Sequence, residues 1–461
     1  MASARKQKKQ RRRARKLGDC LRQFLTPAVW KQAQKRFLRP WQASRWRVQP
    51  LVMSLLLMTF VCGDSLEERF ESARGVVVAL RPKRRRPGET VEGFEKALAR
   101  LPMYVLRRVS AAVRARLPEV LGGRWVTGGF VVFGCDGSRL ECPRAVQLEG
   151  RLGQAGKADS APSVWLTALV HLATGVVWAW RVGKGTASER DHLKHLVATL
   201  PALALVVCDA GYTGYELCRV LLAQGVHFLI RVSSTVTLYT EEKVPLERFR
   251  EGIVYYWTDK ARKDGDPSLR VRLIRVIGKK RTKEGVRSYD VWLLTSVLSP
   301  RRLPVSHAAQ WYRWRWENEG FFRTYKRTLT MVKLKSRTVG LVHREAEGSL
   351  LATQLLLAMT AAALPPAATA DSAKVSPRRA VQEFRREFQH VTRPRRRPPL
   401  ARRLAQAVRE KRPNRRSPKT AREWPRRTPH KPPGAPHFLR LANFKKIQRI
   451  AVQERRPVTS C

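Results

Sequence analysis

Two apolar runs that each end in an aspartate constrain the fold of this chain most. Residues 130–135 (FVVFGC) are followed directly by Asp136, and residues 203–208 (LALVVC) are followed by Asp209. Short apolar runs bounded by glycine or turn residues predict buried β-strands. The sequence therefore predicts an α/β chain in which both carboxylates lie at the ends of core strands.

Each aspartate also has a purely structural alternative. An acidic residue that follows a strand often caps the helix after it, and Asp209 precedes a glycine-containing turn and an apolar helical segment. The preceding residues, Cys135 and Cys208, are predicted to face the core, because neighbouring residues of a strand point to opposite sides.

The segment WYRWRWENEGFFRTYK, residues 311–326, contains a further acid among cations and a phenol. At roughly 100° per residue, Tyr312, Arg315, Glu319 and Lys326 fall on one helical face, within an arc of about 60°. Phe321 and its apolar neighbours point to the opposite side. The alternative is a solvated face with an Arg315–Glu319 ion pair, which stabilises a helix by only about 0.2–0.5 kcal/mol.

Three converging carboxylates repel one another unless a divalent metal ion neutralises them. Oxygen ligands without a histidine cluster favour Mg²⁺ or Mn²⁺ over Zn²⁺. A centre made of Asp136, Asp209 and Glu319 would suit two-metal phosphoryl transfer, with Arg315 and Lys326 holding the flanking phosphates.

These residues resemble the DDE transposases of the insertion sequence 4 family. The Y-R-E-K signature of that family has intervals of two, three and six residues, and Tyr312-x2-Arg315-x3-Glu319-x6-Lys326 matches it in full. The resemblance implies that Glu319 is the third metal ligand after Asp136 and Asp209. It also implies that the tyrosine, arginine and lysine contact the phosphates of the transposon end.

The family has an RNase H-like core with a β-rich insertion before the helix of the catalytic glutamate. The 73 residues from Asp136 to Asp209 and the 110 from Asp209 to Glu319 agree with this, and residues 233–300 contain several short β-type runs. Trp292 matches the insertion tryptophan that stacks on a flipped base in relatives. Its alternative is a core position in a half-buried strand.

The charge of the chain indicates a polyanionic partner. Lysine and arginine number 92 against 36 acidic residues, a formal net charge of +56. We expect a basic N-terminal region (1–125), which the resemblance makes a DNA-end-binding domain, a catalytic core (126–345) and a core helix (346–371). A proline- and arginine-rich tail (372–461) is expected to be disordered.

Other sequence features favour a protein of the reducing cytoplasm. Seven cysteines are scattered without a CxxC pair, and the apolar run 51–62 is too short to span a bilayer and predicts a buried helix instead. We therefore expect no membrane association and a cytoplasmic, nucleoid-associated protein of a bacterium.

The function that follows from the residues and the resemblance is cut-and-paste DNA transposition. The expected enzyme cleaves transposon ends, acts as an endonuclease with two Mg²⁺ or Mn²⁺ ions, and joins the freed 3′-hydroxyl to target DNA. Its expected partners are terminal inverted repeats, target DNA and a second copy in a homodimeric synaptic complex. The alternatives are an RNase H-like nuclease without strand transfer and a catalytically vestigial DNA-binding protein.

Overall fold

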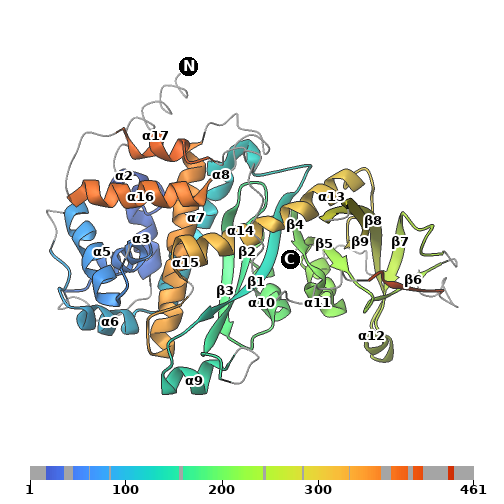
Figure 1. Ribbon diagram of the computed structural model, residues 1–461, viewed down its shortest axis with the longest axis horizontal. Coiled ribbons are helices and arrows are strands. Elements are labelled where there is room, and N and C mark those ends of the chain that lie inside the picture. Colours follow the sequence, from blue (N-terminus) through green and yellow to red (C-terminus); the bar gives the residue numbers. More distant parts are fainter. Residues whose placement is uncertain are drawn as a thin grey trace. The chain divides into compact units, whose positions relative to one another are not determined.

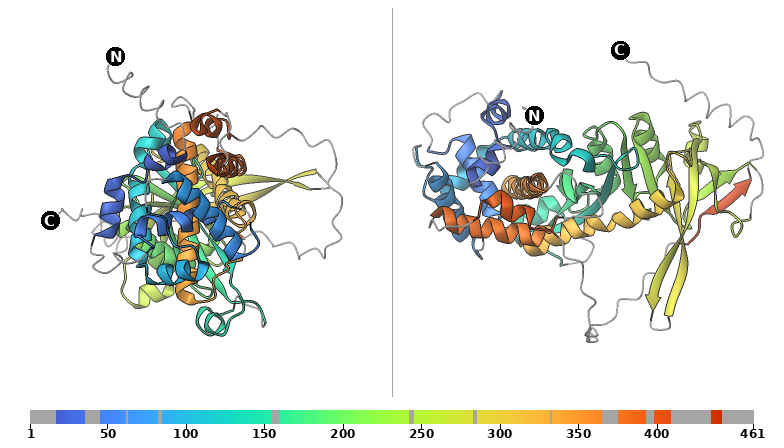
Figure 2. Two further views of the ribbon diagram at one scale, coloured as in Figure 1. Left: turned by 90° about the vertical axis from the view of Figure 1, so that its left-hand side faces the viewer. Right: turned by 90° about the horizontal axis from the view of Figure 1, so that it is seen from above.

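The computed structural model shows an α/β protein whose chain packs into two compact units (Figures 1 and 2). It describes residues 17–35, 45–61, 63–81, 85–154, 159–241, 245–282, 285–331, 333–364, 375–392, 398–408 and 434–440. The first unit comprises Met1–Trp125, Gly137–Ser188 and Trp316–Arg409, and the second comprises Val126–Asp136, Glu189–Arg315 and Glu410–Cys461. These units are defined by contacts within the chain, and the predicted domain boundaries at 125, 345 and 371 stay predictions.

The first unit is mainly helical. Its helices are α2 (Leu17–Arg22), α3 (Pro27–Gln34), α4 (Val48–Met58), α5 (Leu66–Leu80), α6 (Val91–Arg100), α7 (Met103–Ala115), α8 (Leu117–Leu121), η1 (Gly122–Arg124), α9 (Val146–Leu152), α14 (Trp316–Arg323), η3 (Thr324–Thr328), α15 (Val339–Ala363), α16 (Pro377–Thr392) and α17 (Leu400–Ala405). Local sequence sets their starts: Ser65 and Glu68 form a reciprocal capping box at α5. The apolar run predicted to be a buried helix is α4.

Helix α15 is the centre of the first unit and packs against α4, α7, α17 and strand β3 (Val176–Lys184). By length and composition alone it could cross a membrane, yet 89% of its most apolar window is buried inside the protein, as in a core helix. Buried polar groups fix its position. The Gln354 amide donates to the Trp178 carbonyl at 2.8 Å, and the Ser110 hydroxyl donates to the Gln354 carbonyl oxygen at 3.0 Å.

The second unit is built on a sheet with the strand order β10-β6-β7-β8-β9-β5-β4-β1. Its strands are β1 (Val131–Glu141), β4 (Ala204–Cys208), β5 (His227–Val232), β6 (Thr237–Thr240), β7 (Glu251–Tyr256), β8 (Leu269–Thr282), β9 (Gly285–Thr295) and β10 (His437–Arg440). Its helices are α10 (Glu189–Val197), η2 (Ala210–Tyr212), α11 (Tyr215–Ala223), α12 (Asp259–Lys263) and α13 (Val305–Trp314).

Strand β1 belongs to both units, because its residues up to Asp136 lie in the second and those from Gly137 in the first. It pairs in parallel with β4, which pairs in parallel with β5. On its other side comes β2 (Ser163–His171), which pairs antiparallel with β3. The order β3-β2-β1-β4-β5, with helices after β3 and β4, is that of an RNase H-like core, as predicted from the sequence.

The β-rich insertion expected at residues 233–300 is formed by β6, β7, β8 and β9, with the short helix α12 between β7 and β8. Antiparallel pairing joins β6 to β7, β7 to β8 and β8 to β9, and β9 pairs with the core strand β5. The insertion therefore extends the core sheet, and it ends directly before helix α13.

Part of the region 372–461 is folded, in contrast to the disorder that its composition predicted. Helix α16 buries Val381, Phe384 and Phe388, and α17 buries Leu400 and Leu404. Enough apolar residues recur at helical spacing to pack against the first unit, and Arg385 between them donates to the Phe60 carbonyl at 2.8 Å. Strand β10 adds to the edge of the second unit's sheet, and residues 372–374, 393–397, 409–433 and 441–461 lie outside those described.

Stability of the first unit is expected to fall between pH 6.5 and 4 because of His171. Its Nε2 lies 3.0 Å from the Trp125 carbonyl and its Nδ1 lies 2.8 Å from the Thr174 hydroxyl, so the neutral ring is fully paired. Burial lowers the pKa of His171 to about 4. The unfolded chain binds a proton near pH 6.5 that the folded one excludes, so stability is full above pH 6.5 and is lost as pH falls toward 4, by about 3 kcal/mol. Urea unfolding at several pH values measures this loss, and His171→Asn should remove most of the dependence.

Candidate active site

Asp136 lies on β1 at the point where pairing with β4 stops. Val131 to Gly134 pair with Ala204 to Val207, but β1 itself continues to Glu141, so the strand does not end at Asp136 as the sequence predicted. The continuous buried run ends there instead, because Asp136, Gly137 and Ser138 are partly exposed and Arg139 is exposed, although Leu140 is buried again. The helix-cap alternative does not apply to Asp136, since no helix follows it.

Asp209 follows the last residue of β4 and caps the short helix η2. Its Oδ1 accepts a hydrogen bond from the Gly211 backbone N–H at 2.9 Å, so the cap alternative holds here. The Arg190 side chain of α10 donates to the Gly211 carbonyl at 2.9 Å and fixes the same turn. Capping engages one carboxylate oxygen, which leaves Oδ2 for another ligand.

Both cysteines that precede the aspartates are fully buried, as strand alternation predicted. The Cys135 thiol lies 3.6 Å from the Tyr212 hydroxyl, and burial is the main cause that raises the pKa of Cys208. The Cys208 thiol therefore stays protonated, and both thiols lie in the core.

Arg315 places one positive charge near both aspartates of the second unit. Its guanidinium lies 3.6 Å from Asp136 Oδ2, and its side chain is only 12% exposed. Burial lowers its pKa, but Tyr312, Asp136 and Asp209 together outweigh burial, so the pKa of Arg315 is raised. The guanidinium also lies 5.7 Å from the ring centroid of Tyr312. Asp136, Asp209, Tyr312 and Arg315 thus form one cluster, which we call the aspartate cluster.

The predicted helix over residues 311–326 is interrupted. Helix α13 ends at Trp314, α14 begins at Trp316, and from Thr324 the chain forms the π-helix η3. A π-helix has more residues per turn than an α-helix, so the angle expected for Lys326 from a uniform helix does not hold. The apolar face is confirmed, because Phe321, Tyr325 and their neighbour Leu329 are buried.

Glu319 and Lys326 belong to the first unit, whereas Tyr312 and Arg315 belong to the second. Glu319 is exposed on α14. Lys326 is partly buried in η3, and burial lowers its pKa. The buried neighbour Asn318 has neither side-chain nitrogen nor oxygen hydrogen-bonded, which is uncommon for a fully buried amide and was not foreseen from the sequence.

The acidic side chains determine whether the protein can hold a metal ion. Among the described residues, no group of three or more histidines, cysteines or acids lies close enough to hold a metal ion. Among the described residues, the aspartate cluster has a donor set suitable for a hard divalent ion. Its two carboxylates both lie near Arg315, and they offer only oxygen ligands. These two residues fit Mg²⁺ or Mn²⁺, and the role of Glu319 as third ligand stays a prediction.

Trp292 is 3% exposed on β9 and packs inside the insertion. Its ring centroid lies 6.2 Å from that of Phe249 and 6.4 Å from that of Phe438 on β10, and the Arg275 guanidinium lies 5.4 Å from its ring. These contacts favour the core alternative over base stacking.

Sequence reasoning missed Arg272 of β8, which organises the chain that leads into α13. Its guanidinium is buried at 1% exposure, lies 2.7 Å from Glu251, and donates to the carbonyl of Leu303 at 2.9 Å. It also donates to the carbonyls of Val297 and Ser299 at 3.3 and 3.4 Å. Arg272 alternates with apolar residues along its strand, and that pattern gave no sign of a buried cation.

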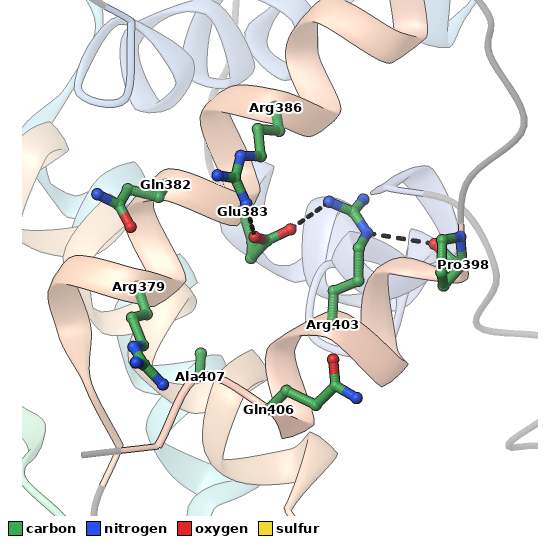
Figure 3. Close-up of a pocket in the computed structure, with 8 residues that line it drawn as sticks. All are labelled: Arg379, Gln382, Glu383, Arg386, Pro398, Arg403, Gln406 and Ala407. Atoms are coloured by element: carbon green, nitrogen blue, oxygen red, sulfur yellow. Dashed lines mark hydrogen bonds and ion pairs between the residues drawn. The ribbon is translucent and has the colours of Figure 1, made fainter. Parts of the chain in front are cut away.

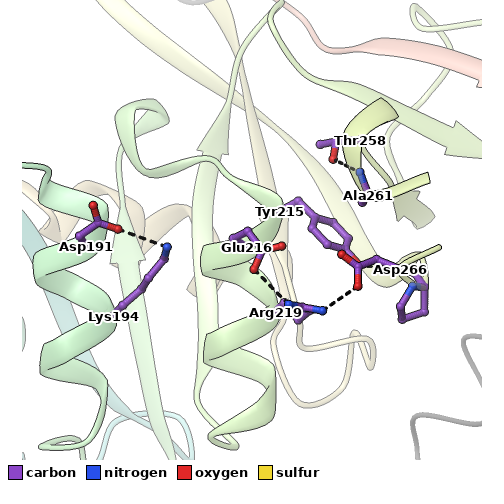
Figure 4. A network of polar contacts seen from close by, with 9 residues as sticks. Asp191, Lys194, Tyr215, Glu216, Arg219, Thr258, Ala261 and Asp266 are labelled. Carbon is purple, nitrogen blue, oxygen red and sulfur yellow. Dashed lines mark hydrogen bonds and ion pairs between the residues drawn. The ribbon is translucent and has the colours of Figure 1, made fainter. Parts of the chain in front are cut away.

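Two further polar groups have structural roles. In the second unit, Arg219 of α11 bridges Glu216 and Asp266, and so ties α11 to the loop before β8 (Figure 4).

In the first unit, a cavity of about 580 Å³ lies between α16 and α17 (Figure 3). Arg403 on its wall pairs with Glu383 and the buried Glu387. Both groups are internally compensated ion pairs.

The chain combines an RNase H-like core with two aspartates that both act on Arg315. Residues 133–355 match the sequence model of the family described as "Transposase DDE domain", and this range includes Asp136, Asp209 and Glu319. The match supports a DDE transposase, an enzyme of DNA transposition.

Comparison with solved structures found a similarity to a piggyBac transposase synaptic complex with hairpin DNA, solved by cryo-EM. The TM-score is 0.39 at 13% identity, over 81% of this chain and 79% of that chain. No curated protein matches the sequence.

Proposed function

We propose that this protein is a metal-dependent transposase of the insertion sequence 4 family that cleaves transposon ends and joins the 3′-hydroxyl to target DNA. The observation that carries the proposal is the aspartate cluster. Asp136 and Asp209 come from neighbouring parallel strands, inside the segment that matches transposase DDE domains, and act together on Arg315.

Asp136, Asp209 and Glu319 would hold two Mg²⁺ or Mn²⁺ ions. When bound, such ions lower the pKa of an attacking water or hydroxyl and stabilise the leaving oxygen of an in-line displacement. Arg315 contributes a charge that stays positive at every relevant pH, because its pKa is raised. With Tyr312 and Lys326 it binds phosphates, and it neutralises Asp136 while no metal is present.

The proposed partners are double-stranded DNA with terminal inverted repeats, target DNA and a second copy of the chain in a synaptic homodimer. The excess of basic residues, 92 against 36 acidic ones, supports binding to a polyanion. We place the protein in the bacterial cytoplasm, associated with the nucleoid. The expected boundaries at 125, 345 and 371 belong to the same proposal.

The test uses DNA that flanks the gene, carrying whatever inverted repeats are found there, with Mg²⁺, Mn²⁺ or a chelator. The proposal predicts cleavage at the repeat ends and joined products that require the metal and disappear on chelation. Cleavage without any joined product would favour the nuclease alternative.

A vestigial DNA-binding protein is the second candidate, because the described residues hold no preformed group of three metal-binding side chains. It predicts DNA binding without products at any metal concentration. Binding that is unchanged in Asp209→Ala, with no cleavage by either protein, would establish this second function.

A further inference from the structure

Strands β8 and β9 extend far beyond the sheet to which they belong. The pairing of β8 with β7 ends at Ile274, and that of β9 with β5 ends at Trp292. Pairing between β8 and β9 continues for seven more residue pairs, from Val276↔Val291 to Thr282↔Gly285. These residues, 276–282 and 285–291, pair with no third strand among the described residues. We call them the ribbon, and it appears in the right-hand view of Figure 2 as a long two-stranded extension of the insertion (yellow).

The ribbon is about 24 Å long, at roughly 3.4 Å per residue. Two-stranded hairpins without support are marginally stable in water. The base of this one is anchored, because Arg275 forms an ion pair with Asp290 at 2.7 Å and donates to the Glu247 carbonyl at 2.8 Å. The anchor fixes the base of the ribbon to the rest of the insertion.

The described side chains of the ribbon include apolar groups in contact with solvent. Ile277 is 66% exposed and Tyr289 is 39% exposed. The Tyr289 ring lies against its cross-strand partner Gly278, where a Cβ atom would come within 2.5 Å of the ring. Glycine therefore permits the aromatic ring to lie across the ribbon. Ile277 and Tyr289 lie on opposite faces of the ribbon, because Tyr289 pairs with Gly278, so a partner that covers both must enclose the ribbon.

The charge of the ribbon identifies the chemistry of that partner. The two strands of the ribbon, residues 276–282 and 285–291, contain four basic residues, Lys279, Lys280, Arg281 and Arg287, and one acidic residue, Asp290, so their net charge is 4 − 1 = +3. Lys280 and Arg287 are direct cross-strand neighbours in the register. Like charges at such positions destabilise a hairpin unless an anion lies between or beside them.

We propose that the ribbon enters the major groove of duplex DNA. The major groove is about 12 Å wide and admits a two-stranded β-ribbon, whereas the minor groove, about 6 Å wide, does not. In this position the positive charge of the ribbon lies between the two phosphate chains, and one face of the ribbon lies toward the base edges. This inference rests on the proposed function and assigns the insertion a DNA-binding surface apart from the aspartate cluster.

The test compares Lys279→Ala/Lys280→Ala with Lys260→Ala/Lys263→Ala, in which two exposed lysines of α12 in the same insertion are removed. The probe is a 40-base-pair DNA duplex of mixed sequence, titrated at several salt concentrations. Loss of two phosphate contacts should reduce the slope of log K against log salt by about 2 and weaken binding roughly tenfold or more at physiological salt. The α12 control should keep the wild-type slope.

Protection of guanine N7 from dimethyl sulfate reports occupation of the major groove. Wild type and the α12 control should protect guanines that the ribbon variant leaves reactive. An equal loss of affinity in both variants, or no guanine protection by wild type, would overturn the inference. So would equal affinity for an RNA duplex of the same sequence, because the major groove of RNA is too deep and narrow for the ribbon.

The outcomes separate this inference from the proposed function. Metal-dependent cleavage and joining by both variants, with unchanged guanine protection, would leave the transposase and remove the ribbon as a groove-binding element. Ribbon-dependent protection by a protein that yields no cleavage products would keep the ribbon and remove the transposase.

Discussion

Glu319→Gln is expected to abolish both cleavage and joining while DNA binding remains within about twofold of wild type. The substitution keeps the size of the side chain and removes the negative charge that a divalent ion requires of its ligand. Loss of roughly 4 kcal/mol of transition-state stabilisation corresponds to about a thousandfold lower rate. Glu319 is exposed on α14, so the folded state should be unaffected.

The matched control is Glu317→Gln, the same chemical change two residues earlier on the same helix. It should retain most of the activity, because Glu317 lies outside the Y-R-E-K spacing. Single-turnover cleavage and joining on the flanking-DNA substrate, with excess protein, measures both variants. Equal activity of Glu319→Gln and wild type would remove Glu319 from the site, and equal loss in both variants would point to a general electrostatic effect.

Much of the fold followed from local patterns in the sequence. The apolar runs before Asp136 and Asp209 became β1 and β4, and the apolar segment near residue 350 became the buried helix α15. These predictions succeeded because burial of a continuous apolar run depends little on distant residues. The β-rich insertion was also predicted, since short alternating runs between turn residues have few other stable arrangements.

Features that depend on tertiary packing did not follow from the sequence. The change to a π-helix at Thr324 and the break at Arg315 require knowledge of what each segment packs against. The same holds for the continuation of β1 past Asp136, which the change from apolar to polar residues concealed. The α16 helix was missed because its arginine content suggested disorder, although its apolar residues recur at helical spacing.

The candidate site shows the same division. The sequence placed Asp136 and Asp209 at the ends of two core strands, and the structure adds that these strands are neighbours and that Arg315 lies against Asp136. Contact between an arginine and an acid 179 residues earlier in the chain is a property of the folded sheet, which local spacing does not reveal. The burial of Trp292 likewise depends partly on Phe438 of β10, 146 residues later.

Arg272→Ala is expected to lower the free energy of unfolding of the second unit by about 3–5 kcal/mol. Removal of one partner of a buried ion pair leaves Glu251 uncompensated. It also leaves the carbonyls of Val297, Ser299 and Leu303 without their buried donor. Burial lowers the pKa of Arg272, because the folded protein removes water from its guanidinium.

The control for Arg272→Ala is Arg275→Ala on the same strand, whose ion pair with Asp290 is more exposed and should contribute about 1 kcal/mol or less. Urea unfolding, with hydrogen exchange of the β8 amides to assign the transition to the second unit, measures both variants. Because Arg272 fixes the chain before α13, its loss should also increase exchange at the start of that helix, whereas Arg275→Ala should not. If the two variants unfold at the same urea concentration, the buried arginine does not organise this part of the protein, and another contact must position Tyr312 and Arg315.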